Sequence, residues 1–342
     1  MMLYLRYDKS TEKGVFGMKA VLIDEITKDL YIGQATDSVC GENELLVRVK
    51  ATSLNRADLL QREGKYPPPK GESTILGLEM AGIVEQVGEQ VTGWEIGERV
   101  FALLPGGGYA EKVVIPSKMA MRIPNNISYT DAAAIPEAFL TAYLNLVTLG
   151  DLKEKEYVLI HAGASGVGTA AIQLAKEIGA AVIVTAGSKE KLDYCLSLGA
   201  DFAINYKDGD FSDKVMEITN NQGVDLILDF IGASFWQYNV NSISIDGRWV
   251  LIGTLGGNKV SDVNIGAFLA KRIKYMGSTL RTRTPEFKIE LTEAFSQFAL
   301  DKIKVGTIRP VIDKVYNWTD VEEAHNRMKE NRNIGKLVLE ID

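Results

Sequence analysis

The chain has 342 residues, of which 46% are hydrophobic and 24% are charged, and its formal net charge at pH 7 is -7. This length allows a large core and two domains, and the negative charge argues against a nucleic-acid binder. We find no run of 18 or more apolar residues that would predict a membrane span.

The N-terminal segment 1–17 carries charges throughout and lacks the apolar region and cleavage site of a secretory signal. We expect it to be a disordered extension, with the folded protein beginning at Met18. The two cysteines, Cys40 and Cys195, lie far apart and outside any paired-cysteine motif. They predict no disulfide framework and favour a reducing, cytoplasmic location.

Short apolar segments alternate with breaks rich in glycine or proline from Met18 to about Leu140. This pattern predicts short strands, at residues 18–23, 44–54, 81–87 and 99–104. The segment Pro67–Pro69 fixes a loop, because proline excludes both a helix interior and a central strand. We therefore predict a β-rich domain over residues 18–140.

Strands and helices alternate after Pro136. The predicted strands cover 157–163, 180–187, 201–206, 224–232 and 247–257, and the predicted helices cover 169–180 and 190–200. Parallel βαβ units produce this alternation, so we predict a doubly wound parallel sheet, a Rossmann domain, over residues 141–285. The tail, 286–342, returns to strand-rich texture and is assigned to the first domain. Its predicted helices are 289–300 and 319–330, and its predicted strands are 308–313 and 336–341.

A glycine-rich turn joins the first strand of this region to its helix, in HAGASGVGTAAIQLAKEIGA. Such a turn lets the backbone approach a pyrophosphate, and the helix N-terminus adds free N–H groups. The alternative is a turn that only allows helix and strand to pack closely. The predicted dinucleotide-binding residues of this turn are Gly163, Ser165, Gly166, Val167 and Gly168.

The end of the second strand indicates which dinucleotide is bound. An acid there binds the ribose of NAD, but this strand runs into Gly187 and Ser188, with Lys191 close behind. Ser188 and Lys191 could hold a 2′-phosphate, and Tyr206 could flank the same pocket. We therefore predict NADPH, although Glu190 argues against it and the lysines could belong to a solvated helix start.

Several segments follow one another in a recognisable order: MKAVLI, ATSLNRADLLQREGKYPPP, ILGLEMAGIVEQVG, GERVFALLPGGGYAE, AAAIPEAFLTAYLNL and VLIHAGASGVGTAAIQLAK. They resemble the medium-chain dehydrogenase/reductase superfamily and, within it, the zinc-free, zeta-crystallin-like quinone oxidoreductases, over residues 18–342. The resemblance is greatest to the tumour-suppressor-inducible quinone oxidoreductases. It implies a GroES-like β-rich catalytic domain and a Rossmann domain, with the active site in the cleft between them.

The resemblance also bears on metal binding. Zinc-dependent alcohol dehydrogenases of this superfamily have Gly-His-Glu where this chain has Gly77, Leu78 and Glu79, and their ligand cysteine falls near Asn55. Leucine cannot ligate a metal, and the histidines and cysteines of this chain are widely dispersed, so we expect no metal site. Glu79 is then expected to be a structural carboxylate that bridges polar groups beneath the cleft, with an arginine or backbone N–H groups as partners. A proton relay is the alternative.

Without a Lewis acid, an electrophilic quinone or enone is easier to reduce than an alcohol is to activate. The acceptor oxygen gains negative charge as a hydride arrives and needs a hydrogen-bond donor. The resemblance implies Asn55 beside the nicotinamide, Tyr66 at the substrate and Thr141 on the nicotinamide side. Their alternatives are a turn residue, loop packing and helix packing.

The remaining cofactor residues are implied by the resemblance alone: Phe230, Ile231, Gly253, Leu255, Ser278, Leu280 and Asn331. It also implies a homodimer through the edge of the Rossmann sheet, with GRWVLIG and KRIKYMGSTL contributing. Quinone reduction is the leading hypothesis. The alternatives are reduction of 2-enoyl thioesters or α,β-unsaturated ketones, a low-turnover NADPH-binding structural or stress protein, and RNA binding, which the acidic charge disfavours.

Overall fold

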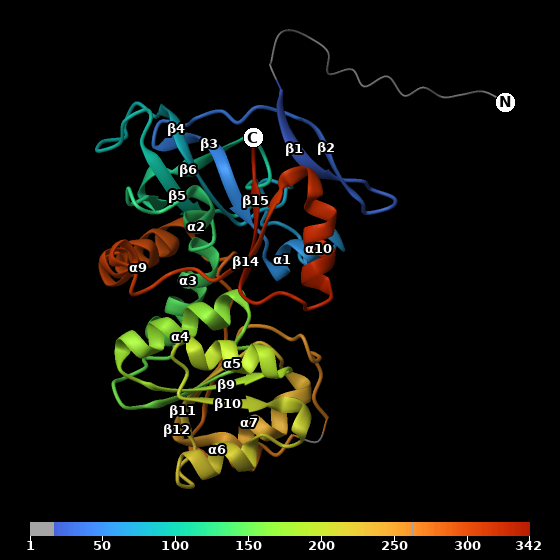
Figure 1. Cartoon of the computed structure of the whole chain (residues 1–342), viewed down its shortest axis with the longest axis vertical. Helices are drawn as coiled ribbons and strands as arrows, with labels where there is room; N and C mark the ends of the chain where they lie inside the picture. Colours follow the sequence, from blue (N-terminus) through green and yellow to red (C-terminus); the bar gives the residue numbers. More distant parts are fainter. Residues whose placement is uncertain (1–16, 262) are drawn as a thin grey trace, which may run out of the picture.

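The computed structural model describes residues 17–261 and 263–342, so the predicted extension 1–17 lies outside it apart from Gly17. The strands form two large sheets and a two-stranded hairpin. Figure 1 shows one large sheet in the upper half of the molecule and the other in the lower half. The upper half combines the first strands of the chain with the last ones.

The upper sheet has the strand order β14-β15-β3-β4-β5-β7, with β6 also paired to β3. Its pairs are antiparallel except for β14 with β15, which are parallel. The strands are β3 (Glu44–Ser53), β4 (Glu79–Val87), β5 (Arg99–Leu103), β6 (Lys112–Pro116), β7 (Ala120–Arg122), β14 (Ile312–Asn317) and β15 (Lys336–Glu340). A separate hairpin is formed by β1 (Met18–Ile23) and β2 (Leu30–Ala35).

The lower sheet consists of six parallel strands in the order β10-β9-β8-β11-β12-β13. Numbered from its own first strand, this is the order 3-2-1-4-5-6, in which dinucleotides bind where the order reverses. That point lies between β8 and β11. The strands are β8 (Tyr157–Ile160), β9 (Ala181–Ala186), β10 (Phe202–Asn205), β11 (Val224–Asp229), β12 (Ile243–Leu251) and β13 (Lys274–Gly277).

Helices cover both sheets and the space between them. Those of the lower half are α4 (Gly166–Ile178), α5 (Lys189–Ser197), α6 (Ser212–Ile218), α7 (Trp236–Ser242) and α8 (Ile265–Lys271). The others are α1 (Arg56–Arg62), α2 (Tyr129–Ala133), α3 (Pro136–Tyr143), α9 (Pro285–Val305) and α10 (Val321–Lys329). Within the described residues, no helix is both long enough and apolar enough to cross a membrane.

One hydrophobic core connects the two halves. It runs from Phe101 in the upper sheet through Phe139 of α3 and Phe295 of α9 to Ile172 of α4 and Leu228 of the lower sheet. Burial of this apolar surface is the main force that holds the two sheets in place. The shared core therefore fixes the two sheets relative to each other, and with them the cleft between the sheets.

The predicted combination of a β-rich part and a doubly wound parallel sheet is confirmed, but several details were wrong. The strand predicted at 247–257 is β12, which covers Ile243–Leu251. The strand predicted at 308–313 begins only at Ile312, because Pro310 has no N–H to donate to a sheet. The segment GRWVLIG does not lie at the sheet edge, since β12 pairs with both β11 and β13. On that side of the sheet β13 is the outer strand.

Candidate active site

The glycine-rich turn begins where β8 ends and leads directly into α4. The side-chain oxygen of Ser165 caps this helix by accepting a hydrogen bond from the Gly168 N–H over 3.0 Å. A Cβ atom on Gly163 would lie 2.8 Å from Val184, and one on Gly168 would lie 2.4 Å from the Ala162 carbonyl oxygen. These two glycines therefore allow the turn, β9 and α4 to pack closely, which is the alternative considered for the motif.

A cavity of about 640 Å³ opens at this turn, at the carboxyl ends of the parallel strands. Segments of the upper half, around Asn55 and from Met328 to Lys336, form its other wall. This position is the one at which doubly wound sheets bind their ligands. Its volume lies within the range of small-molecule and cofactor sites.

The cavity brings together many of the predicted residues. Those that line it are Asn55, Ser165, Gly166, Val167, Gly187, Lys191, Tyr206, Phe230, Ile231, Leu255 and Asn331. The predicted residues that do not line it are Tyr66, Thr141, Gly163, Gly168, Ser188, Gly253, Ser278 and Leu280. Their contact with a cofactor or substrate stays a prediction.

Ser278 follows β13 and is buried, and its side-chain oxygen has no hydrogen-bond partner among the described residues. A buried hydroxyl without a partner is costly, so a bound polar group would stabilise it. The predicted contact of Ser278 with the nicotinamide fits this observation. Leu280, two residues later, is buried as well.

Cationic side chains gather where a 2′-phosphate is predicted to bind. The Lys191 ammonium donates to the Asn331 carbonyl oxygen over 2.6 Å, and the Arg56 guanidinium donates to the Asn331 side-chain oxygen over 2.6 Å. Burial lowers the pKa of Lys191; Asp313 and Glu190 raise it, whereas Lys207 and Arg56 lower it further. A bound anion would relieve the repulsion among these three cations.

Ser188 itself serves as the N-cap of α5, where its side-chain oxygen accepts from the Lys191 N–H over 3.4 Å. Gly187 lies against Tyr206, since a Cβ on this glycine would be 2.6 Å from the tyrosine hydroxyl. A larger side chain at Gly187 would therefore displace the Tyr206 ring. The tip of β9 carries a hydroxyl and nearby lysines rather than an acid.

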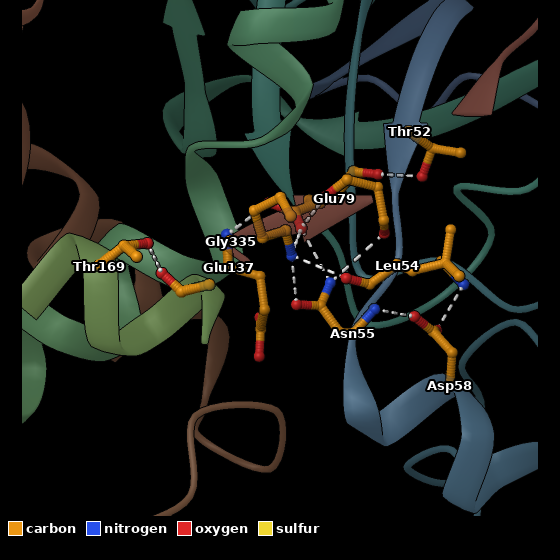
Figure 2. Close-up of polar contacts among 12 residues, drawn as sticks. Thr52, Leu54, Asn55, Asp58, Glu79, Glu137, Thr169 and Gly335 are labelled. Carbon is orange, nitrogen blue, oxygen red and sulfur yellow. Dashed lines mark hydrogen bonds and ion pairs between the residues drawn. The ribbon is translucent and has the colours of Figure 1, made fainter. Parts of the chain in front are cut away.

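A fully buried carboxylate, Glu79, organises the wall of the cavity. One of its oxygens accepts from the Ser53 hydroxyl, from Asn55 Nδ2 over 2.8 Å and from Lys336 Nζ over 2.7 Å. The other accepts from the backbone N–H of Glu137 over 2.8 Å. Figure 2 shows Asn55 and Glu137 beside Glu79; Asn55 follows β3, Glu79 begins β4 and Glu137 belongs to α3.

These contacts define the role of Glu79. It bridges polar groups as predicted, with a backbone N–H among its partners, but its cationic partner is Lys336 and not an arginine. Lys336 also donates to the Leu54 carbonyl oxygen over 2.8 Å and to Asn55 Oδ1 over 2.6 Å, so its three protons are all used. Asn55 is consequently held at both ends of its amide.

Asp58, in α1, stabilises the backbone around Asn55. Its carboxylate accepts from the backbone N–H groups of Asn55 and Gly77, over 2.7 Å and 3.0 Å. Burial raises its pKa to about 6, against the effect of these two hydrogen bonds and of Lys336. Asp58 thus fixes the turn before α1.

The resemblance implied Lys336 only near the cofactor phosphate region and not as the partner of Glu79, and it did not imply Arg56 at all. The signal for Lys336 was a charged residue at the start of an apolar strand, KLVLEI. The signal for Arg56 was its place beside Asn55. Neither pattern specifies a partner, because both contacts join segments more than 250 residues apart: Lys336 to Glu79, 257 residues away, and Arg56 to Asn331, 275 residues away.

Two sequence families match the chain: zinc-binding dehydrogenases over residues 166–297 and the alcohol dehydrogenase GroES-like domain over residues 41–125. The synaptic vesicle membrane protein VAT-1 homolog of Danio rerio is 30% identical, over 97% of this chain and 72% of that protein. The quinone oxidoreductase of Sus scrofa is 31% identical, over 87% of this chain and 89% of that protein. The highly-reducing polyketide synthase 1 of Aureobasidium melanogenum is 31% identical, but the chain spans only 13% of its length.

Solved structures share the whole fold. A quinone oxidoreductase of Pseudomonas syringae and the CurK enoyl reductase each have a TM-score of 0.84, at 29% and 27% identity. An NAD-dependent alcohol dehydrogenase has a TM-score of 0.83 at 29% identity, and a mycobacterial protein complexed with NADPH has 0.84 at 26%. Each alignment covers 95% of this chain and 100% of the other.

The name of the first family raises the question of zinc. Beside Glu79 lie the apolar side chain of Leu78, the amide of Asn55 and the ammonium of Lys336. An ammonium already neutralises Glu79 and would repel a second cation. In residues 17–261 and 263–342, no group of three His, Cys, Asp or Glu side chains is arranged to hold a metal ion. The residues at this position do not fit zinc.

We expect Lys336→Met to destabilise the fold by about 3–5 kcal/mol, because it leaves the Glu79 carboxylate buried without a cation. Urea unfolding followed by circular dichroism measures the loss. Adding Glu79→Gln to the same variant should restore part of it, since the uncompensated charge is then removed. The control is Lys314→Met, which breaks the exposed Lys314–Glu323 pair and should change stability little. Equal losses in both single variants would contradict this role.

Proposed function

Because this chain belongs to the medium-chain dehydrogenase/reductase superfamily, we propose that it is a zinc-independent, NADPH-dependent quinone reductase of the zeta-crystallin-like branch. The observation that carries the proposal is the replacement of metal-ligating groups beside Glu79 by Leu78, Asn55 and the Lys336 ammonium. Without a Lewis acid at this point, an acceptor that is already electrophilic is the favoured substrate. The similarity to two quinone oxidoreductases supports the same choice.

The nicotinamide would supply the hydride. The turn at Ser165–Val167 and the N-terminus of α4 would hold the pyrophosphate with free backbone N–H groups. The Ser278 hydroxyl, which has no partner among the described residues, would bind the nicotinamide end of the cofactor. We propose NADPH over NADH because Lys191, Arg56 and Lys207 gather at the end of β9, where no acid stands to bind a ribose hydroxyl.

The acceptor oxygen needs a hydrogen-bond donor as it gains negative charge. Asn55 already donates to Glu79, so its amide is better suited to positioning than to stabilising an anion. Tyr66 is half-buried, and among the described residues its hydroxyl has no hydrogen bond. Burial raises the pKa of Tyr66, and the charge of Glu137 raises it further, against the effect of Arg281. Tyr66 therefore stays protonated and able to donate at neutral pH.

Reduction of 2-enoyl thioesters or related enones is the second candidate, favoured by the similarity to CurK enoyl reductase. It needs the same hydride and the same donor to a carbonyl oxygen. A protein that binds NADPH with little turnover is a third possible outcome. The free cysteines, Cys40 and Cys195, support a reducing compartment, and we propose the cytoplasm.

The acceptor is tested by mixing the purified full chain with NADPH and EDTA and following cofactor absorbance after addition of an ortho-quinone, a para-quinone or an enoyl thioester. We expect rapid oxidation with a quinone, unchanged by EDTA. Faster NADPH oxidation with the thioester than with a quinone would indicate an enoyl reductase instead. Tight NADPH binding without turnover of any acceptor would contradict both reductase functions.

Lys191→Ala should weaken NADPH binding about 10- to 100-fold, the effect of losing one hydrogen bond between charged groups. Binding of NADH should change less than about twofold, since NADH lacks the 2′-phosphate. Fluorescence titration of the reduced cofactors measures both constants. Lys189→Ala is the matched control, because Lys189 is exposed and pairs with Asp193. Equal weakening of both cofactors would mean that Lys191 does not select NADPH.

We also propose a homodimer through the outer strand β13. On the neighbouring α8, Ile265 and Leu269 are 77% and 82% exposed and lie four residues apart on one helix face. Covering them and the free edge of β13 would stabilise a pair of chains. In sedimentation velocity the wild type should run as a dimer, and Leu269→Lys should shift it to monomer. Val305→Lys, at an exposed residue of α9, should leave the dimer intact.

A further inference from the structure

A second fully buried carboxylate, Asp229, is the last residue of β11 and directly precedes a segment that lines the cavity. One of its oxygens accepts from the backbone N–H groups of Ile231 and Gly232, over 2.8 Å and 2.9 Å. The other accepts from Trp249 Nε1 over 3.0 Å and from Asn239 Nδ2 over 3.2 Å. All four donors are neutral, and two of them belong to the backbone that follows Asp229.

These contacts give a direction to a longer series of hydrogen bonds. With a fixed N–H donor on each oxygen, Asp229 acts as a carboxylate, and Asn239 presents its NH₂ group to it. The Asn239 side-chain oxygen then accepts from His161 Nε2 over 2.7 Å. Burial lowers the pKa of His161, against the charge of Asp229 and the hydrogen bond with Asn239, so the ring is neutral at pH 7.

A neutral imidazole with its proton on Nε2 accepts at Nδ1. The donor there is the Thr185 hydroxyl, 2.8 Å away. Asp229, Asn239, His161 and Thr185 are called the Asp229 chain below. Each of its members has one orientation, and such a fully paired buried network is rigid.

The Asp229 chain connects the ends of three neighbouring strands. His161 directly follows β8, Thr185 is the last residue but one of β9, and Asp229 ends β11. Cavity-lining residues lie at all three places: Ala162 after β8, Thr185 itself in β9, and Phe230 after β11. The chain therefore fixes the relative positions of three segments of the cavity wall.

Ala162 gives a reason why this support is needed. Its φ is 49°, in the left-handed region that residues other than glycine rarely adopt. Such a backbone persists only where its surroundings hold it. On one side the His161 N–H donates to the Leu228 carbonyl oxygen over 3.1 Å, and on the other the Gly163 N–H donates to the Thr185 carbonyl oxygen over 3.0 Å. The glycine-rich turn thus begins at a strained residue that is held between β9 and β11.

We propose that the Asp229 chain positions the dinucleotide, by holding the strand ends of the cavity in the shape that binds it; this role rests on the cofactor site proposed above. A preformed site binds more tightly because less has to be ordered on binding. The chain supports the glycine-rich turn, which would meet the pyrophosphate that NADPH and NADH share. It includes none of the cations proposed to bind the 2′-phosphate. Loosening the chain should therefore weaken both cofactors alike.

Thr185→Val tests this role, because it replaces the hydroxyl by a methyl group and leaves His161 Nδ1 without its donor. In fluorescence titrations of the purified full chain, we expect the Kd values for NADPH and NADH each to rise about tenfold. Thr185→Ser, which keeps the hydroxyl, should recover part of the affinity. If Thr185→Val does not fold, Thr185→Ala, which also lacks the hydroxyl, takes its place.

Thr292→Val is the matched control. This buried threonine of α9 donates to the Lys288 carbonyl oxygen over 2.8 Å, so the control also removes one buried hydroxyl bond, but at a residue that does not line the cavity. Urea unfolding should show a loss of stability in both valine variants, whereas Thr292→Val should change each Kd by less than about twofold. A Thr185→Val variant that binds both cofactors like the wild type would overturn the proposal, as would equal weakening by Thr292→Val.

A second readout needs no cofactor. The chain has two histidines, so nitrogen-15 NMR resolves their imidazole signals, and His161→Gln assigns them. At pH 7 the wild type should contain His161 as the neutral Nε2–H tautomer, and Thr185→Val should shift its Nδ1 signal. A protonated or Nδ1–H ring in the wild type would contradict the direction of the Asp229 chain and overturn the proposal. A wild type that binds neither NADPH nor NADH would instead refute the proposed cofactor site.

Discussion

The buried ion pair between Glu79 and Lys336 is the interaction on which the site depends. A carboxylate with no solvent contact is costly unless its charge is matched and its oxygens are hydrogen-bonded, and here Lys336, Ser53, Asn55 and the Glu137 N–H do both. Meeting that requirement joins the ends of β3 and β4 to β15 and α3. The last strand of the chain thereby becomes part of the cavity wall.

This network separates the polar groups that hold the site from those free to react. Asn55 uses both ends of its amide within the network, and Lys336 uses all three of its donors. Tyr66 lies outside this network, and among the described residues its hydroxyl makes no hydrogen bond. A saturated network is rigid, so it positions its neighbours well and stabilises new charge poorly. We therefore expect the reacting groups to lie outside the network, and the network to hold them in position.

How far the sequence predicted the site follows from the range of the interactions. The glycine turn, the parallel strands and the missing acid after β9 are local patterns, and the structure places them at one cavity. The partner of Glu79 is not a local pattern, since Lys336 lies 257 residues away. The sequence analysis predicted that Glu79 bridges polar groups, but its cationic partner comes from the tail of the chain. The late start of β14 is local again, and Pro310 explains it.

The two ends of the cleft differ in how much of their function the fold itself determines. At the cofactor end the fold itself supplies strand ends and a helix N-terminus of the kind that bind a dinucleotide. The proposed preference for NADPH rests on the cations Lys191, Arg56 and Lys207. At the substrate end the shared fold fixes no substrate. Quinone and enone reductases need the same hydride and the same oxygen donor, but they differ in which atom finally takes the proton. We therefore expect the substrate class to depend on the groups around Tyr66, whose hydroxyl makes no hydrogen bond among the described residues.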